Sequence, residues 1–253
     1  MPGQTPYAHK NVRKVINNDL PDLGNKTPFC VHMGVWLPPV RYTRSMFSDL
    51  TLVNITAILF IIFISTAIHE MMHAFVAFKL GDDLAHSRGR LTLNPMAHID
   101  PFLTVILPLI MLVLGLTPIL AAKPVPINVN RVKGEELGLA LIGIAGPLTN
   151  LVLAFFAAMS LRFGNLDGFL FDFVFAFFSI NVGLFVFNML PIPPLDGSRL
   201  LYAFAPEPVQ RFMEQIESFG IFGVILIVTV LAPFLGPVLD NVQRSVSLFL
   251  IGA

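Results

Sequence analysis

Residues 50–80 read LTLVNITAILFIIFISTAIHEMMHAFVAFKL, an apolar run long enough to cross a membrane as a helix. Near its end stands the pentapeptide HEMMH, residues 69–73, which places three ionisable side chains among hydrophobic neighbours. Ionisable groups are costly at membrane depth, so a functional role is the first interpretation of such residues. This stretch therefore predicts a membrane helix that carries a chemical site.

The pentapeptide has the spacing of a zinc site. On a helix, His69 and His73 lie one turn apart on the same face, so both imidazoles can reach one ion at about 2.0–2.1 Å. Glu70 falls on the adjacent edge of the helix. There it can take a proton from an attacking water and pass it to the leaving amine.

The composition is that of a multi-pass membrane protein. Of the 253 residues, 55% are hydrophobic and 13% are charged, which is too little charge for the surface of a soluble protein of this size. The formal net charge is zero and no block of lysine or arginine stands out, so we expect no nucleic-acid partner. Cys30 is the single cysteine, which excludes an intrachain disulfide and a cysteine-based zinc knuckle.

Five apolar runs follow one another along the chain. They are residues 50–80, 102–122, 137–161, 169–190 and 219–239. Runs of about 20 residues can cross a hydrocarbon core of about 30 Å as helices. We therefore expect an all-α fold, a polytopic membrane helix bundle with four to five spanning segments. The second run is interrupted by Pro108, Gly115 and Pro118, so we expect this one to re-enter or break instead of crossing.

The runs suggest three parts. Residues 1–49 are a polar N-terminal extension without the long apolar segment of a signal peptide. Residues 50–204 form the expected metalloprotease core. Residues 205–253 carry a surface helix from about Pro206 to Ser218, followed by a C-terminal membrane helix. The loops are short, so we expect no separate soluble domain.

A catalytic zinc ion has three protein ligands and an open fourth position, so we expect one further protein ligand beside the two histidines. The candidates are Asp196, His86, His98 and Asp100. We favour Asp196, because prolines in residues 191–194 break the fourth run before it and Gly197 after it allows a sharp turn. An interfacial loop aspartate with a solvated charge is the alternative. The two other histidines flank a polar loop, which favours a surface role or one beside the site.

This ligand set bears on the topology. His73 and Asp196 both lie toward the C-terminal ends of their runs. Strict alternation of five spans would make the first and fourth runs antiparallel and place these ends on opposite sides. The two ends can join in one site if they meet near the midplane of the membrane, or if a re-entrant or broken second run brings both to the same side, and we favour the second topology.

Two longer motifs resemble the site-2 protease family of intramembrane zinc metalloproteases. The sequence NMLPIPPLDG, residues 188–197, fits the family pattern NxxPxPxLDG at every fixed position, and HEMMH fits HExxH. GPLTN, residues 146–150, is similar to the family's GxxxN motif. Residues 89–101 and 122–126 resemble the minimal bacterial and archaeal members. The resemblance covers about residues 60–204.

The resemblance implies that His69, His73 and Asp196 bind one Zn²⁺ per chain and that Glu70 activates water. It implies that Asn188 helps to hold the substrate carbonyl or the developing oxyanion; a helix-end asparagine that satisfies its own backbone is the alternative. The substrate would be a single-span membrane protein, cut within or near its transmembrane segment in regulated intramembrane proteolysis. The enzyme would be a multi-pass protein of the cell (inner or plasma) membrane, in contact with lipid. No nucleotide-sensing or PDZ domain is expected.

Three further features have competing interpretations. Ala140, Gly143, Ala145 and Gly146 form a small-residue face that close helix packing explains. Asn150 either hydrogen-bonds a neighbouring helix or orients the catalytic region. The alternating Val125, Ile127 and Val129 suggest an edge strand within residues 122–132 that pairs with an unwound substrate.

The rival hypothesis is a non-proteolytic membrane protein, either a metal transporter or a pseudoprotease that only binds its clients. A transporter would more typically distribute several ionisable residues along a transmembrane path. This chain concentrates them at one place, with Glu70 left over from the ligand set, and that favours the protease.

Overall fold

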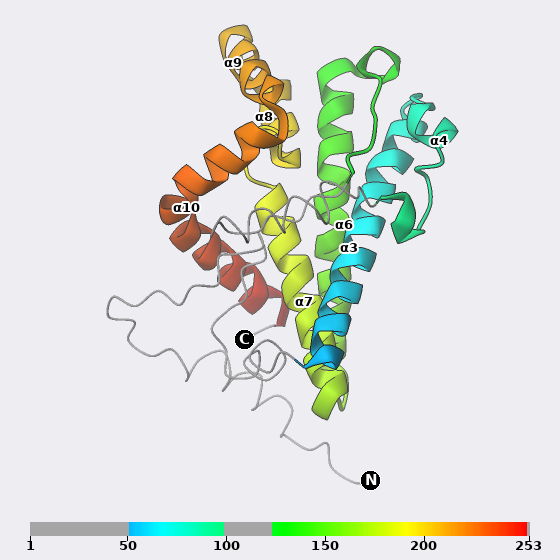
Figure 1. Cartoon of the computed structure of the whole chain (residues 1–253), viewed down its shortest axis with the longest axis vertical. Helices are drawn as coiled ribbons and strands as arrows, with labels where there is room; N and C mark the ends of the chain where they lie inside the picture. The colour runs from blue at the N-terminus through cyan, green and yellow to red at the C-terminus, as the bar shows by residue number, and fades with distance from the viewer. Residues whose placement is uncertain (1–50, 99–122, 252–253) are drawn as a thin grey trace.

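The computed structural model of the chain describes residues 51–98 and 123–251, and within them all regular structure is helical (Figure 1). The helices are α3 (Leu52–Lys79), α4 (Leu84–Ser87), α6 (Glu135–Phe163), α7 (Gly168–Asn188), α8 (Asp196–Phe204), α9 (Glu207–Ser218) and α10 (Gly220–Ile251), with 3₁₀ turns η1 (Pro95–Ala97) and η3 (Val129–Arg131). The expected all-α fold is confirmed. The N-terminal extension and the second apolar run lie outside the described residues.

Three helices in the described ranges, α3, α6 and α7, are long and apolar enough to cross a membrane. They correspond to the first, third and fourth apolar runs. The fifth run forms the beginning of α10, which continues beyond the predicted end to Ile251. The predicted surface helix is α9, Glu207–Ser218. The chain is thus a membrane helix bundle.

Local signals determine where these helices begin. Thr51 caps α3, because its side chain accepts a hydrogen bond from the backbone N–H of Asn54 at 3.3 Å. Before α6, Gly134 adopts φ +89°, a left-handed conformation that glycine takes without strain. Two acidic residues, Glu135 and Glu136, then stand in the first turn of α6, where the helix dipole favours negative charge.

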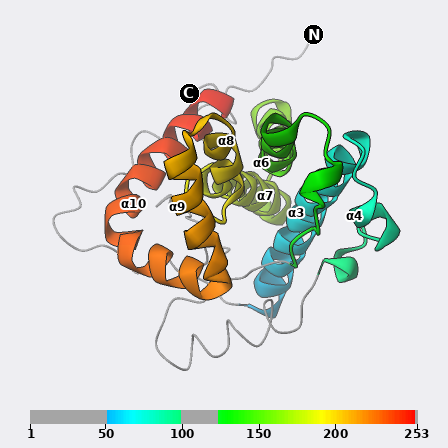
Figure 2. The ribbon, with the colours of Figure 1, turned by 90° about the horizontal axis from the view of Figure 1, so that it is seen from above.

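Helix α7 is central to the packing of the bundle. Its residues Phe178 and Val182 join a buried cluster with Ala154 and Ala158 of α6 and with the end of α10. Another part of α7 packs against α3 in a second buried cluster. Inside a membrane, helices associate through close packing, and small residues such as the alanines of α6 allow that approach. Figure 2 shows α9 and α10 on one side of this bundle and α3 with α4 on the other.

The described helices do not follow strict alternation of five spans. In Figure 1, α3 and α7 run in the same direction and α6 runs opposite to both. The backbone N–H of Lys133, just before α6, donates to the carbonyl of Leu80 at 2.8 Å, so α6 begins where α3 ends. The N–H of Lys123 likewise donates to the carbonyl of His98 at 2.9 Å. The ends of α3 and α7 can therefore meet at the same level, as the favoured ligand set requires.

Candidate metal centre

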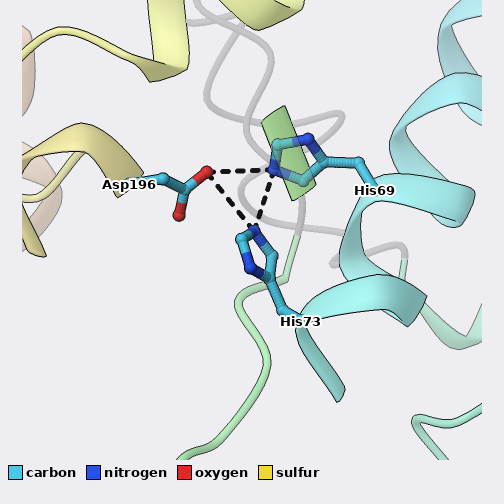
Figure 3. A group of neighbouring side chains, drawn as sticks. All are labelled: His69, His73 and Asp196. Atoms are coloured by element: carbon cyan, nitrogen blue, oxygen red, sulfur yellow. Dashed lines mark hydrogen bonds and ion pairs between the residues drawn. The ribbon is translucent and has the colours of Figure 1, made fainter. Parts of the chain in front are cut away.

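Two helices far apart in the sequence bring three candidate ligand atoms together. His69 Nε2 lies 3.0 Å from His73 Nε2 and 3.0 Å from Asp196 Oδ2, and His73 Nε2 lies 3.3 Å from the same oxygen (Figure 3). The histidines project from α3, and the aspartate is the first residue of α8. Both histidines are buried, each with 5% of its surface exposed.

Hydrogen bonds behind the rings assign the protons of the histidines. His69 Nδ1 lies 2.5 Å from Asn150 Oδ1, and His73 Nδ1 lies 2.6 Å from the carbonyl oxygen of Ile142. Both partners accept, so both Nδ1 atoms carry the hydrogen and both Nε2 atoms present lone pairs. Such partners are what orients metal-binding histidines. When both rings are neutral, two imidazole lone pairs and a carboxylate oxygen converge, an arrangement that a cation or a shared proton would stabilise.

The spacing of the ligand atoms fits zinc. Ligands at about 2.0–2.1 Å from a tetrahedral ion stand about 3.3 Å from one another. The separations of 3.0–3.3 Å among the three atoms match that value. Two nitrogens and one oxygen also form a donor set that zinc accepts while keeping a fourth position open. In the described residues, this trio is the group of side chains that could hold a metal ion.

The charge of Asp196 suits a metal ligand. Asp196 lies on α8, outside the three candidate spans. Burial alone would raise the pKa of its carboxyl, but the positive charge of a protonated His73 and hydrogen bonds from both imidazoles outweigh burial and hold that pKa below its usual value; a cation bound in place of the proton acts in the same direction. The carboxylate is therefore ionised at neutral pH.

The backbone of α6 closes one side of the site at Gly146. A Cβ atom at this position would lie 2.4 Å from His73 Nε2 and 2.6 Å from His69 Nε2, distances that atoms do not adopt. One turn earlier, a Cβ atom at Gly143 would lie 2.9 Å from the backbone oxygen of Asp196. The small residues of α6 thus let the candidate ligands approach its backbone, which is a more specific role than the helix packing expected from the sequence.

Gly197 does not make the sharp turn that the sequence suggested. It is the second residue of α8, and a Cβ atom there would lie 2.4 Å from the carbonyl oxygen of Met189. Glycine is needed because the start of α8 presses against the end of α7. That contact sets where Asp196 stands.

Two other candidates for the third ligand, His98 and His86, lie apart from the trio. His98 Nε2 lies 3.0 Å from the carbonyl oxygen of Thr92, and the His86 ring packs against Phe78 with 4.9 Å between ring centroids. Asp100 lies outside the described residues. The geometry therefore brings Asp196, and not these histidines, to His69 and His73.

Of the remaining predicted residues, Glu70 and Asn150 neighbour or contact His69, whereas Asn188 is hydrogen-bonded to its own helix. Glu70 follows His69 on α3 and is half-buried. Asn188 is the last residue of α7, and its Nδ2 donates to the carbonyl oxygen of Leu184 at 3.0 Å. Its side-chain amide is thus hydrogen-bonded to its own helix, which agrees with the alternative interpretation that Asn188 satisfies its own backbone. Asn150 serves both proposed purposes, because it contacts His69 and also the neighbouring α7.

Residues 123–128 form neither helix nor strand, and the 3₁₀ turn η3 ends the stretch expected as an edge strand, whose pairing with a substrate stays a prediction. Val125 is buried against Ala74 and Ala85, while Val129 begins the 3₁₀ turn η3 and is 56% exposed. The alternation of apolar residues here reflects packing on the end of α3 followed by a turn. The short segment contains two prolines, Pro124 and Pro126, which cannot donate to a ladder.

Comparison with known proteins agrees with the donor set. Residues 165–231, from the loop before α7 to α10, match the model of Peptidase family M50. Over 194 residues the chain is 41% identical to "Putative zinc metalloprotease YwhC" of Bacillus subtilis, covering 72% of this chain and 85% of the relative. The chain belongs to peptidase family M50, the site-2 proteases.

Two further relatives match over shorter stretches of the chain. "Putative zinc metalloprotease Rip2" of Mycobacterium tuberculosis is 33% identical over 174 residues, 68% of this chain and 65% of the relative. "Putative zinc metalloprotease MJ0611" of Methanocaldococcus jannaschii is 40% identical over 136 residues, 53% of this chain and 62% of the relative. No solved structure gives a significant match.

Proposed function

We propose that this M50 protein is an intramembrane zinc endopeptidase that cleaves a single-span membrane protein within or near its transmembrane segment. The observation that carries the proposal is the convergence of two imidazole lone pairs and one carboxylate at the end of apolar helices. The names of the relatives, which call them zinc metalloproteases, support the same reading. We place the enzyme in the cell membrane as a multi-pass protein.

His69, His73 and Asp196 would hold one zinc ion per chain. Zinc bound there supplies Lewis-acid chemistry, since it polarises a peptide carbonyl and lowers the pKa of water toward about 7. The chain's own contribution is a rigid donor set. Both Nδ1 hydrogens are engaged by Asn150 and by the backbone at Ile142, so neither ring is free to rotate.

Glu70 would move the proton during hydrolysis. It neighbours His69 on α3 and is not part of the ligand trio, so its carboxylate is available as a general base. It would take a proton from the attacking water and return it to the leaving amine. Burial beside apolar helices would favour this transfer, because charges interact more strongly where water is scarce.

Asn188 would stabilise the oxyanion only after its amide leaves Leu184. The present hydrogen bond joins residues one turn apart on the same helix, at 3.0 Å. A substrate carbonyl that develops negative charge is a stronger acceptor than that neutral helix carbonyl. The substrate itself must also unwind, because a helix hides its carbonyls in its own hydrogen bonds.

The decisive experiment compares wild type with Glu70→Gln on candidate single-span substrates in detergent. The glutamine keeps the size of the side chain but cannot accept a proton. We expect both proteins to bind one zinc ion and only wild type to cleave. Equal cleavage by the variant would reject Glu70 as the base. A wild type that binds zinc but cleaves none of the substrates would instead favour the transporter or pseudoprotease.

A further inference from the structure

A chain of buried hydrogen bonds leads away from the metal centre. Asn150 Nδ2 donates to Asn181 Oδ1 at 2.8 Å, and Asn181 Nδ2 lies 3.0 Å from Ser65 Oγ. The three side chains come from α6, α7 and α3, and each has 0% of its surface exposed. Polar groups buried in an apolar bundle are costly without partners. These three satisfy one another across three helices.

The backbone at Phe177 determines the direction of every bond in this chain. Asn181 Nδ2 also donates to the carbonyl oxygen of Phe177 at 2.8 Å. A carbonyl can only accept, so the nitrogen of the Asn181 amide must face it and the oxygen must face Asn150. The nitrogen of Asn150 then faces Asn181, which leaves its oxygen for His69.

The two histidines differ in how their protons are held. His73 donates to the main-chain carbonyl of Ile142, an acceptor that cannot reverse. His69 donates to a side-chain amide, which can flip by 180° and present its NH₂ group instead. With Asn150 flipped, His69 Nδ1 would accept, and the hydrogen would move to Nε2, where it blocks a metal. The metal-binding tautomer of His69 therefore depends on an interaction that prevents the Asn150 amide from flipping.

We infer that Asn181 is a positioning residue that holds the Asn150 amide in the orientation that gives His69 its metal-binding tautomer. The inference rests on the zinc site of the proposed function. Asn181 does not hydrogen-bond His69 itself; among its hydrogen bonds, the one to Asn150 leads to that imidazole. Removing its acceptor oxygen would let Asn150 adopt both orientations and would weaken zinc binding.

The first variant is Asn181→Leu, which keeps the approximate volume and removes the acceptor. Zinc affinity is measured on the purified full-length protein in detergent, by competition with a chromophoric chelator. We expect the dissociation constant to rise about tenfold, the lower end of what partners behind a metal ligand contribute. If the leucine variant folds poorly, Asn181→Ala, which also lacks the acceptor, should show the same rise in the zinc dissociation constant.

The rescue variant is Asn150→Asp. A carboxylate has two acceptor oxygens, so it accepts from His69 Nδ1 in either orientation and needs no help from Asn181. In the Asn150→Asp background, the second carboxylate oxygen faces the fixed Asn181 oxygen and both can only accept, so Asn181→Leu should leave zinc binding as tight or tighter. A merely structural role of Asn181 would not disappear in this background, because the packing change on α7 is the same.

The matched control is Val182→Ala. Val182 follows Asn181 on α7, is fully buried, and lies outside the hydrogen-bond chain. Its truncation should lower thermal stability and leave zinc affinity at the wild-type value. Wild-type affinity in Asn181→Leu, or an undiminished loss in the Asn150→Asp background, would overturn the inference. A wild type that binds zinc but cleaves nothing contradicts only the proposed function, because the zinc comparison needs no cleavage.

Discussion

Gly146 lies so close to His73 that a Cβ atom on the glycine would stand 2.4 Å from the imidazole Nε2. The α6 backbone is therefore a wall of the candidate metal centre, and the absence of a side chain leaves room for the two imidazoles. The same glycine approaches His69, where the corresponding distance is 2.6 Å. The arrangement of His69 and His73 therefore depends on the lack of a Cβ atom at Gly146.

Gly146→Ala should abolish stoichiometric zinc binding. Alanine favours a helix interior over glycine by about 0.5–1 kcal/mol, so the backbone gives no reason for loss of folding. The added methyl group would displace both imidazoles from their common point. Zinc per chain, measured by mass spectrometry of the purified protein, should fall from about one to near zero. Gly236→Ala is the control, because a Cβ atom there would meet nothing within 4 Å; equal zinc in both variants would contradict the prediction.

Asp196→Ala should remove the third ligand. Two histidines alone form an incomplete site for zinc, so the bound metal should be lost on gel filtration. Asp83→Ala is the matched control, since the Asp83 side chain is 60% exposed and pairs with Arg131 away from the trio. Retention of one zinc per chain by the Asp196 variant would exclude this aspartate as a ligand.

Asp82→Ala should destabilise the protein far more than Asp83→Ala. Asp82 is fully buried and accepts from the backbone N–H groups of Leu84 at 3.0 Å and Asn128 at 2.6 Å. Its loss leaves two donors without that acceptor, which costs about 3 kcal/mol, or roughly 6–12 °C in Tm. The exposed ion pair of Asp83 should contribute less than about 1 kcal/mol. Similar thermal unfolding of the two variants would show that Asp82 does not tie α3 to the loop before α6.

Tyr202 should titrate abnormally late. Its hydroxyl donates to Glu214 at 2.6 Å, and this bond between α8 and α9 raises the pKa of Tyr202 to about 12. The stability that the bond contributes is fully present below the ordinary tyrosine pKa of about 10 and is lost as the pH rises toward 12. Absorbance at the phenolate band can follow this residue alone in a Tyr7→Phe, Tyr42→Phe background. Glu214→Gln should bring the pKa back toward 10; an unchanged titration would mean that the bond does not form.

Much of the fold could be predicted because membrane helices are encoded locally. The apolar runs at residues 50–80, 137–161 and 169–190 correspond to α3, α6 and α7, since hydropathy over about 20 residues suffices to specify a span. α8 was not expected as a helix, because the prolines before it and Gly197 within it suggested a turn. The glycine reflects instead the close contact with Met189, which no local pattern reveals.

The amino-acid sequence by itself determined that His69 and His73 share one helical face, because helical periodicity depends only on their spacing along the chain. Only the tertiary structure decided that Asp196, 127 positions from His69, completes the trio. It also decided that Gly146 makes room for the two imidazoles and that a hydrogen-bond chain joins Asn181 to His69 through Asn150. These relationships depend on how α6, α7 and α8 pack around α3, and packing between distant segments follows from the shapes of all the helices together.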